Sequence, residues 1–200
     1  MIPPGLYGMA DAGAGDPVES GAMLAAAGSR VIQLRAKGWS PDAIAAAARA
    51  MLPLLRAHGS LLIINDHPAV VAAVGADGVH IGQGDGDVAQ TRALIGPGRL
   101  LGLSTHTPRQ VDDAQAVADY IGFGPVFGTQ TKATGYAPRG VDALADAVRR
   151  SRVPVVAIGG ITRDNVSAVH SSGARCWAVI GDILRSPSPR EAAGFFAAIE

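Results

Sequence analysis

The chain lacks several features that would define a class of protein by themselves. Its 200 residues contain one cysteine, so no intrachain disulfide can form. Cys176 opens the apolar run CWAVIG, which favours a small buried side chain over a nucleophile. No basic residue precedes Arg30, and no apolar run approaches the roughly 20 residues that span a bilayer. We therefore expect a soluble, cytoplasmic protein without a membrane partner.

Charge of either sign is also scarce. Lys plus Arg and Asp plus Glu both number 17, so the formal net charge is +0. This balance argues against an extended nucleic-acid surface and against binding to anionic membranes. Charged residues make up 17% of the chain, against roughly 25% in an average domain. Low surface charge is compatible with a homo-oligomer.

Glycine and short apolar runs, by contrast, are abundant. The 26 glycines fall mostly at the ends of expected strands, where the backbone must bend or approach a ligand. These strands are apolar on both faces, as a sheet buried on both sides requires. They are Leu6–Ala10, Val31–Leu34, Leu61–Ile64, Val79–Ile81, Leu100–Leu103, Tyr120–Val126, Val153–Ile158 and Trp177–Ile180.

A helix is expected after each strand. Several begin with a capping residue, as in Asp16-Pro17 and Thr107-Pro108, and Thr162 and Ser188 are expected to cap later helices. Strict alternation of strand and helix indicates parallel strands with crossover helices. Eight such units predict a (β/α)₈ TIM barrel that forms a single domain over residues 1–200. An open doubly wound sheet is the alternative.

Two carboxylates follow neighbouring strands in the stretch LLIINDHPAVVAAVGADGVHIGQGD. Asp66 comes after Leu61–Ile64, and Asp85 comes after Val79–Ile81. In a parallel sheet both side chains lie at one rim. Two carboxylates suit Mg²⁺, which takes one or two of them together with substrate phosphate oxygens. Asp87 is the better candidate for the following helix cap.

Further polar residues follow the second, third and fifth strands. Gln33, Arg35 and Lys37 alternate with a period of two, so they project from one face. Asn65 precedes the first carboxylate, and Ser104 follows the fifth strand. At the rim of a barrel these residues predict a pocket for an anionic, phosphorylated molecule.

The longest connection, from Phe127 to Gly140, follows the sixth strand. It carries Thr129, Thr131 and Lys132, two hydroxyls and an ammonium that suit a phosphate. A solvated loop without function is the alternative.

A second anion site is expected after the last two strands. Gly159 and Gly160 follow the seventh strand, and Ile180 and Gly181 follow the eighth. Backbone N–H groups at these two positions form the common phosphate cradle of such barrels. Two phosphate sites suggest two phosphorylated substrates or one large one.

Other polar residues are given structural roles. Asp77 lies in a turn at the opposite rim, and His58, His80 and His170 have no evident partners. His106 is left open between a local hydrogen-bonding residue and an acid or base.

The chain resembles thiamine-phosphate synthase over the second to eighth strands. The motifs are QLRAK (33–37), IINDH (63–67), GADGVHIGQGD (75–85), GLSTH (102–106), GPVFGTQTKATGYAP (124–138) and VAIGGI (156–161). Members of that family are (β/α)₈ barrels that join a pyrimidine pyrophosphate to a thiazole phosphate and release pyrophosphate. The resemblance implies a transferase with small phosphorylated substrates.

The resemblance also implies a role for individual residues. Mg²⁺ would be bound by Asp66 and Asp85. The pyrophosphate would be held by Arg35, Lys37, Asn65, Ser104 and Lys132, and the pyrimidine side by Gln33. The thiazole phosphate would be held by Thr129, Thr131, Gly160, Ile180 and Gly181, with Gly159 beside them. The implied chemistry is dissociative: pyrophosphate leaves first, and the thiazole nitrogen then attacks.

The chain departs from the family pattern at three positions. His67 stands where Arg is usual, Gly181 where Ser is usual, and Gly128 where Pro is usual. A related barrel family, the thiazole tautomerases, usually has His where this chain has Pro125 and lacks the two carboxylates. The alternatives are a tautomerase-like isomerase and a non-catalytic protein that binds thiazole phosphate.

Overall fold

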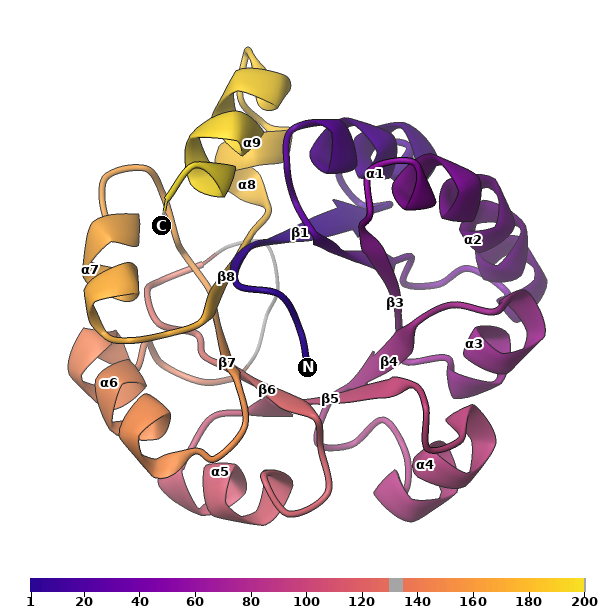
Figure 1. The fold of residues 1–200 in the computed structure, drawn as a ribbon. Helices are drawn as coiled ribbons and strands as arrows, with labels where there is room; N and C mark the ends of the chain where they lie inside the picture. The colour runs from indigo at the N-terminus through magenta and orange to yellow at the C-terminus, as the bar shows by residue number, and fades with distance from the viewer. Residues whose placement is uncertain (130–134, 200) are drawn as a thin grey trace.

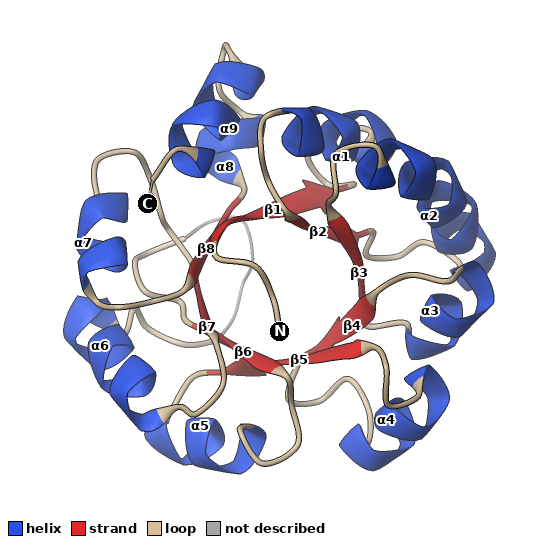
Figure 2. Ribbon diagram, in the orientation of Figure 1, coloured by secondary structure: helices blue, strands red, loops and turns tan. Residues whose placement is uncertain are grey.

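The computed structural model describes residues 1–129 and 135–199, which form a closed barrel of parallel strands inside a ring of helices (Figures 1 and 2). Each strand pairs with the next, and β1 (Gly5–Asp11) closes the sheet against β8 (Cys176–Val179). The expected (β/α)₈ barrel is confirmed, and the open doubly wound sheet is excluded.

The remaining elements follow in strict order around the barrel. The strands are β2 (Val31–Arg35), β3 (Leu61–Asn65), β4 (Gly78–Ile81), β5 (Leu100–Thr105), β6 (Tyr120–Phe123) and β7 (Val155–Ile158). The helices are α1 (Pro17–Ala26), α2 (Pro41–Arg56), α3 (Pro68–Val74), α4 (Val88–Ile95), α5 (Pro108–Ala114), α6 (Gly140–Arg150), α7 (Val166–Ser171), α8 (Gly181–Leu184) and α9 (Pro189–Ala197).

An apolar layer between strands and helices forms the larger core, and α2 shows how the sequence builds it. The Ser40 side chain accepts a hydrogen bond from the Ala43 N–H (3.2 Å) and so caps the helix. Ile44, Met51 and Leu55 recur seven and four residues apart, which places them on one buried face. This face packs against the outside of the barrel.

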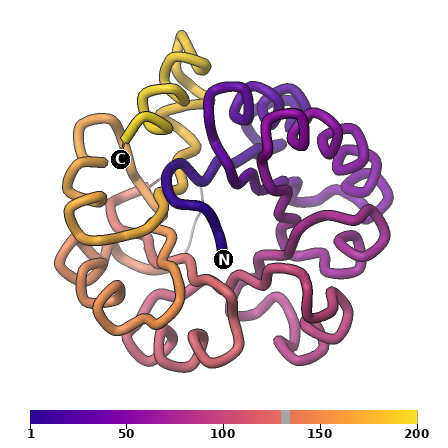
Figure 3. The backbone as a smooth tube through the Cα atoms, in the orientation of Figure 1, coloured from indigo at the N-terminus to yellow at the C-terminus, as the bar shows by residue number. Residues whose placement is uncertain are grey.

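A smaller core fills the barrel itself. Alternate strand residues point inward, and the buried ones make one apolar cluster: Tyr7, Met9, Val31, Ile63, Tyr120, Val156, Cys176 and Ala178. Ile2 belongs to the same cluster and is fully buried, because the N-terminal segment crosses the opening of the barrel (Figures 1 and 3). The structure confirms that Cys176 is a buried side chain.

The structure corrects the sequence-based boundaries in three places. Thr162 does not cap α7, which begins at Val166; instead its N–H donates to Asn165 Oδ1 (2.8 Å) in the turn before the helix. Strand β6 ends at Phe123 rather than Val126, since Pro125 has no N–H for the sheet ladder. After β8 the chain forms two helices, the short α8 and then α9, where a single last helix from Ser188 was expected.

Among the described residues, no helix is both long and apolar enough to cross a membrane.

Candidate active site

A cavity of about 270 Å³ lies at the rim where the strands end and the helices begin. This is the rim at which barrels of this class carry their sites. Several predicted residues line the cavity: Gln33, Arg35, Asn65, Ser104, Thr129, Gly159, Gly160, Ile180 and Gly181. Thr131 and Lys132, which were also predicted, lie outside the described residues.

The two predicted carboxylates lie together beside this cavity. Partial burial raises the pKa of Asp66, and the charge of Asp85 and a hydrogen bond with it raise that pKa further. The Lys37 ammonium acts in the opposite direction, with its Nζ 3.6 Å from Asp66 Oδ2. The neighbouring strands therefore place Asp66, Asp85 and Lys37 at one rim. Their role toward a metal stays a prediction.

The backbone at Asp66 adopts an unusual conformation. Its φ of +62° lies in the left-handed region, and it is the one non-glycine residue of the described chain that does so. Asp tolerates this region better than most residues, but at some cost in free energy. The Asp66 N–H donates to the His80 carbonyl (2.9 Å), which ties the end of β3 to β4. Non-glycine residues held in this way cluster at functional sites.

Arg35 is held by a partner that sequence reasoning missed. Its Nη1 lies 2.6 Å from Asp11 Oδ2, and the two side chains are 14% and 5% exposed. Asp11 also accepts a hydrogen bond from the Gly13 N–H (2.8 Å). The signal was available, because β1 and β2 are neighbours in the expected barrel and Asp11 faces Arg35 in register. The buried carboxylate fixes the guanidinium at the cavity wall.

The floor of the cavity consists of ring side chains that were also missed. Tyr7, His80 and Tyr120 all line it, although His80 was expected to be structural. Its position in β4, two residues after Gly78, directs it into the barrel. Burial raises the pKa of both tyrosine hydroxyls well above their ordinary value, so both stay protonated.

The opposite wall is made by the loops after β7 and β8. Gly159 and Gly160 have φ of +102° and +64°, and a Cβ on Gly159 would lie 2.6 Å from Pro125 Cα. Only glycine allows the loop after β7 to approach the loop after β6 so closely. Arg185, which sequence reasoning missed, also lines the cavity at the end of α8.

His106 sits at the same cavity. Its Nδ1 is 2.5 Å from the Gly124 carbonyl oxygen, and its ring stacks on Tyr136 with centroids 4.1 Å apart. These contacts identify the local hydrogen-bonding role, one of the two that the sequence left open. Asp77 accepts a hydrogen bond from the Leu62 N–H (2.8 Å) at the far rim, as expected of a structural residue.

Comparison with known proteins gives the family. The model of the thiamine monophosphate synthase family matches residues 6–183. The chain belongs to this family. It is 44% identical to a thiamine-phosphate synthase of Chlorobium luteolum, over 86% of this chain and 82% of the relative. It is 41% identical to one of Anaeromyxobacter dehalogenans, over 90% and 82%.

A solved structure agrees. The chain is similar to a thiamine phosphate pyrophosphorylase from Pyrococcus furiosus with a TM-score of 0.86 and 29% identity, over 96% of this chain and 93% of that one. Family membership confirms the resemblance found in the sequence, and with it the expectation of a transferase enzyme.

Proposed function

We propose that the protein joins hydroxymethylpyrimidine pyrophosphate to thiazole phosphate, giving thiamine phosphate and pyrophosphate. One observation carries this proposal. The cavity is lined by Arg35 and Asn65 on its β2–β3 side, where Lys37 and the two carboxylates lie beside it at the same rim. Its β7–β8 side is lined by glycine-rich backbone together with Asp182 and Arg185. Two chemically different walls suit two different phosphorylated substrates that must meet.

The residues at the β3–β4 rim fit Mg²⁺. Partial burial raises the pKa of Asp66, and the charge of Asp85 raises it further; a bound divalent cation would relieve the repulsion between the two carboxylates. We assign Asp66 and Asp85 as the two protein ligands, which leaves the other positions to phosphate oxygens and water. Bound there, Mg²⁺ would neutralise charge on the pyrophosphate.

The reaction needs no protein nucleophile. The bond between the pyrimidine methylene carbon and the pyrophosphate oxygen breaks, and its electron pair leaves with the pyrophosphate. Arg35, Lys37 and Ser104, with Asn65 and Lys132, bind the leaving group and stabilise its growing charge. The thiazole nitrogen then attacks the electron-poor carbon, so catalysis rests on positioning and electrostatics.

The remaining residues hold the two organic parts. We assign Gln33, which is 4% exposed, to the pyrimidine. We assign Thr129, Thr131 and the backbone at Gly159, Gly160, Ile180 and Gly181 to the thiazole phosphate. The hydroxyl that is missing at Gly181 is compensated, in this proposal, by the nearby Arg185 guanidinium at the same cavity.

The test is release of pyrophosphate when both precursors and Mg²⁺ are mixed with the protein. Asp66→Asn should lower the rate by at least about a hundredfold, because it changes a proposed metal ligand and loss of even an outer-shell partner costs about 10–100-fold. Asp87→Asn is the matched control: Asp87 caps α4 through its Oδ1, Asn also caps, and the rate should be unchanged.

Other outcomes separate the alternatives. Conversion of the thiazole phosphate alone, insensitive to a chelator, would identify a tautomerase-like isomerase. Binding of thiazole phosphate in calorimetry without turnover would identify a non-catalytic relative.

We propose the cytoplasm as the compartment. Homo-oligomer formation stays a prediction that light scattering can check.

A further inference from the structure

An unbroken chain of hydrogen bonds crosses the cavity floor and reaches Ser104. Gln33 Nε2 donates to Tyr7 Oη (3.0 Å), and Tyr7 Oη is 2.9 Å from Tyr120 Oη. Tyr120 Oη is 3.2 Å from His80 Nδ1, and His80 Nε2 is 3.0 Å from Ser104 Oγ. Gln33 lies in β2, and the other four side chains of this chain come from four further strands, one from each of β1, β6, β4 and β5.

The Gln33 donor and the burial of the two tyrosines together set the direction in which this chain runs. Tyr7 and Tyr120 are 2% and 0% exposed, and buried hydroxyl protons require an acceptor. Because Gln33 donates to Tyr7, the Tyr7 proton goes to Tyr120, and the Tyr120 proton goes to His80 Nδ1. A neutral imidazole that accepts at Nδ1 carries its proton on Nε2. His80 therefore donates to Ser104 Oγ.

The sequence makes room for these rings. A Cβ on Gly102 would collide with the Tyr120 ring and with His80 Nδ1, and a Cβ on Gly122 would lie 3.2 Å from His80 Cε1. Both glycines point into the barrel at the level where larger residues usually fill such an interior. The space that they leave is occupied by the hydrogen-bonded pair of Tyr120 and His80.

We propose that this chain holds His80 as the Nε2–H tautomer and thereby turns the Ser104 hydroxyl proton toward the leaving pyrophosphate. Tyr7, Tyr120 and His80 are positioning residues that act through Ser104. The inference rests on the proposed function, because that function assigns Ser104 to the pyrophosphate.

The direction matters because pyrophosphate oxygens only accept hydrogen bonds. When Oγ accepts from His80, its own proton is available to the leaving oxygen and stays on Oγ throughout. In the reversed chain Ser104 would donate to His80, and its lone pairs would face the phosphate charge. Hydrogen bonds in a chain also polarise one another, which makes the last hydroxyl a better donor. Gln83 Nε2 holds the Ser104 carbonyl (2.6 Å) and fixes the backbone there.

The first test needs neither substrate nor variant activity. In the ¹⁵N-histidine spectrum of the native protein, His80 should show a protonated Nε2 and an unprotonated Nδ1. The signal is assigned by its loss in His80→Gln. A protonated Nδ1 in the neutral ring would mean that the chain runs the other way and would overturn the proposal.

The second test is a double-mutant cycle on pyrophosphate release. Tyr120→Phe should lower kcat about tenfold, the size expected for one lost hydrogen bond, with the KM for thiazole phosphate unchanged. Ser104→Ala should lower kcat on the order of a hundredfold, as loss of an oxyanion donor does. In the Ser104→Ala background, Tyr120→Phe should have no further effect. If the decreases in kcat caused by Tyr120→Phe and Ser104→Ala multiply in the double variant, Tyr120 acts independently of Ser104, and the proposal is wrong.

A third test compares two substitutions of His80 and does not depend on whether Tyr120→Phe folds. The amide nitrogen of Gln can replace Nε2 as donor to Ser104, whereas that of Asn falls near Nδ1. His80→Gln should keep most of kcat and His80→Asn should lose it; equal losses would count against the proposal. If the native protein releases no pyrophosphate, the proposed function fails, but the tautomer measurement still stands.

Discussion

At the scale of single residues, the Arg35–Asp11 pair shows how a buried carboxylate can fix a guanidinium in the position where it binds an anionic substrate. Both side chains are largely shielded from water, so removing one charge leaves the other without compensation. Asp11→Asn should lower the free energy of unfolding by about 2 kcal/mol. It should also raise the KM for pyrimidine pyrophosphate about tenfold, because the guanidinium is no longer fixed.

Urea unfolding and steady-state kinetics check this prediction. Asp146→Asn is the matched control, since it breaks an Asp–Arg pair whose side chains are 48% and 70% exposed. Exposed pairs contribute little, so neither stability nor KM should change. Equal effects of the two substitutions would contradict the role of Asp11.

Gly160, in the cavity wall after β7, leads to a second prediction at the scale of single residues. Gly160 has φ of +64°, and a Cβ there would strike the Gly128 carbonyl oxygen. Gly160→Ala should raise the KM for thiazole phosphate and destabilise the fold by about 1–3 kcal/mol. Gly194→Ala, in α9 with open space around it, should instead stabilise the protein by up to about 1 kcal/mol. Calorimetric unfolding of both variants checks the contrast.

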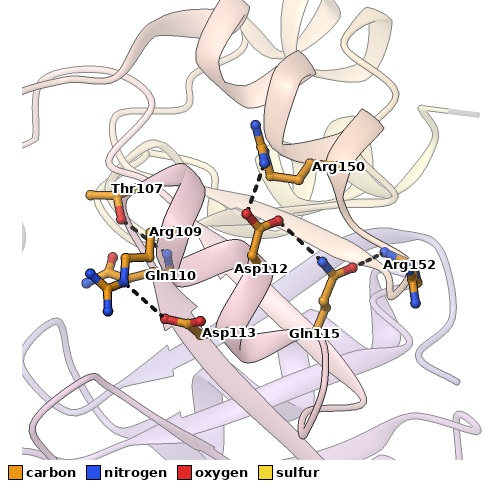
Figure 4. A network of polar contacts seen from close by, with 8 residues as sticks. All are labelled: Thr107, Arg109, Gln110, Asp112, Asp113, Gln115, Arg150 and Arg152. Atoms are coloured by element: carbon orange, nitrogen blue, oxygen red, sulfur yellow. Dashed lines mark hydrogen bonds and ion pairs between the residues drawn. The ribbon is translucent and has the colours of Figure 1, made fainter.

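At the scale of elements, the start of α5 is built like a capping box and leads directly to the cavity. Thr107 Oγ1 accepts from the Gln110 N–H (3.3 Å), and Gln110 Oε1 accepts from the His106 N–H (2.8 Å). On the outer face of the helix, Asp112 pairs with Arg150 of α6 at 2.9 Å, and Arg109 pairs with Asp113 (Figure 4). The cap, rather than these exposed pairs, should set the stability of the element.

Thr107→Ala should therefore cost about 1 kcal/mol of unfolding free energy. Ser188→Ala is its matched control, because the Ser188 side chain makes no capping hydrogen bond at α9 and its loss should cost much less. Thermal unfolding of the two variants gives the comparison. A larger loss at Ser188 than at Thr107 would refute this account of the caps.

At the scale of the whole molecule, the N-terminal segment completes the barrel core. Ile2 is fully buried in the interior cluster, with its carbonyl accepting from Arg175 Nε (3.3 Å). Ile2→Ala should lower the free energy of unfolding by about 2–4 kcal/mol, and Ile2→Val by about 1 kcal/mol. Because the site lies at the other end of the barrel, kcat of the folded variants should stay near that of the native protein. Chemical denaturation and kinetics together check this.

The order of strands and helices was predictable because it depends on local pattern. Once the barrel was inferred, the positions of Asp66, Asp85 and Lys37 after neighbouring strands followed from topology alone. The site wall at Gly159, Gly160, Ile180 and Gly181 followed in the same way. What these residues bind stays a prediction.

The barrel floor was not predictable by the same means. Tyr7 and Tyr120 are 113 residues apart, and their contact depends on which alternate residues meet across the interior. The partner of Arg35 was missed because Asp11 and Arg35, which end neighbouring strands, were not compared across the β1–β2 pair. Thr162 was misassigned because a turn stabilised by Asn165 has the same local signals as a helix cap.

The left-handed backbone at Asp66 has a consequence for evolution in the laboratory. Glycine would adopt that conformation without the roughly 1 kcal/mol that another residue loses there. A library screened only for heat resistance should therefore enrich glycine at position 66. The selected variants would be more stable to heat but would lack the carboxylate at the rim of the barrel.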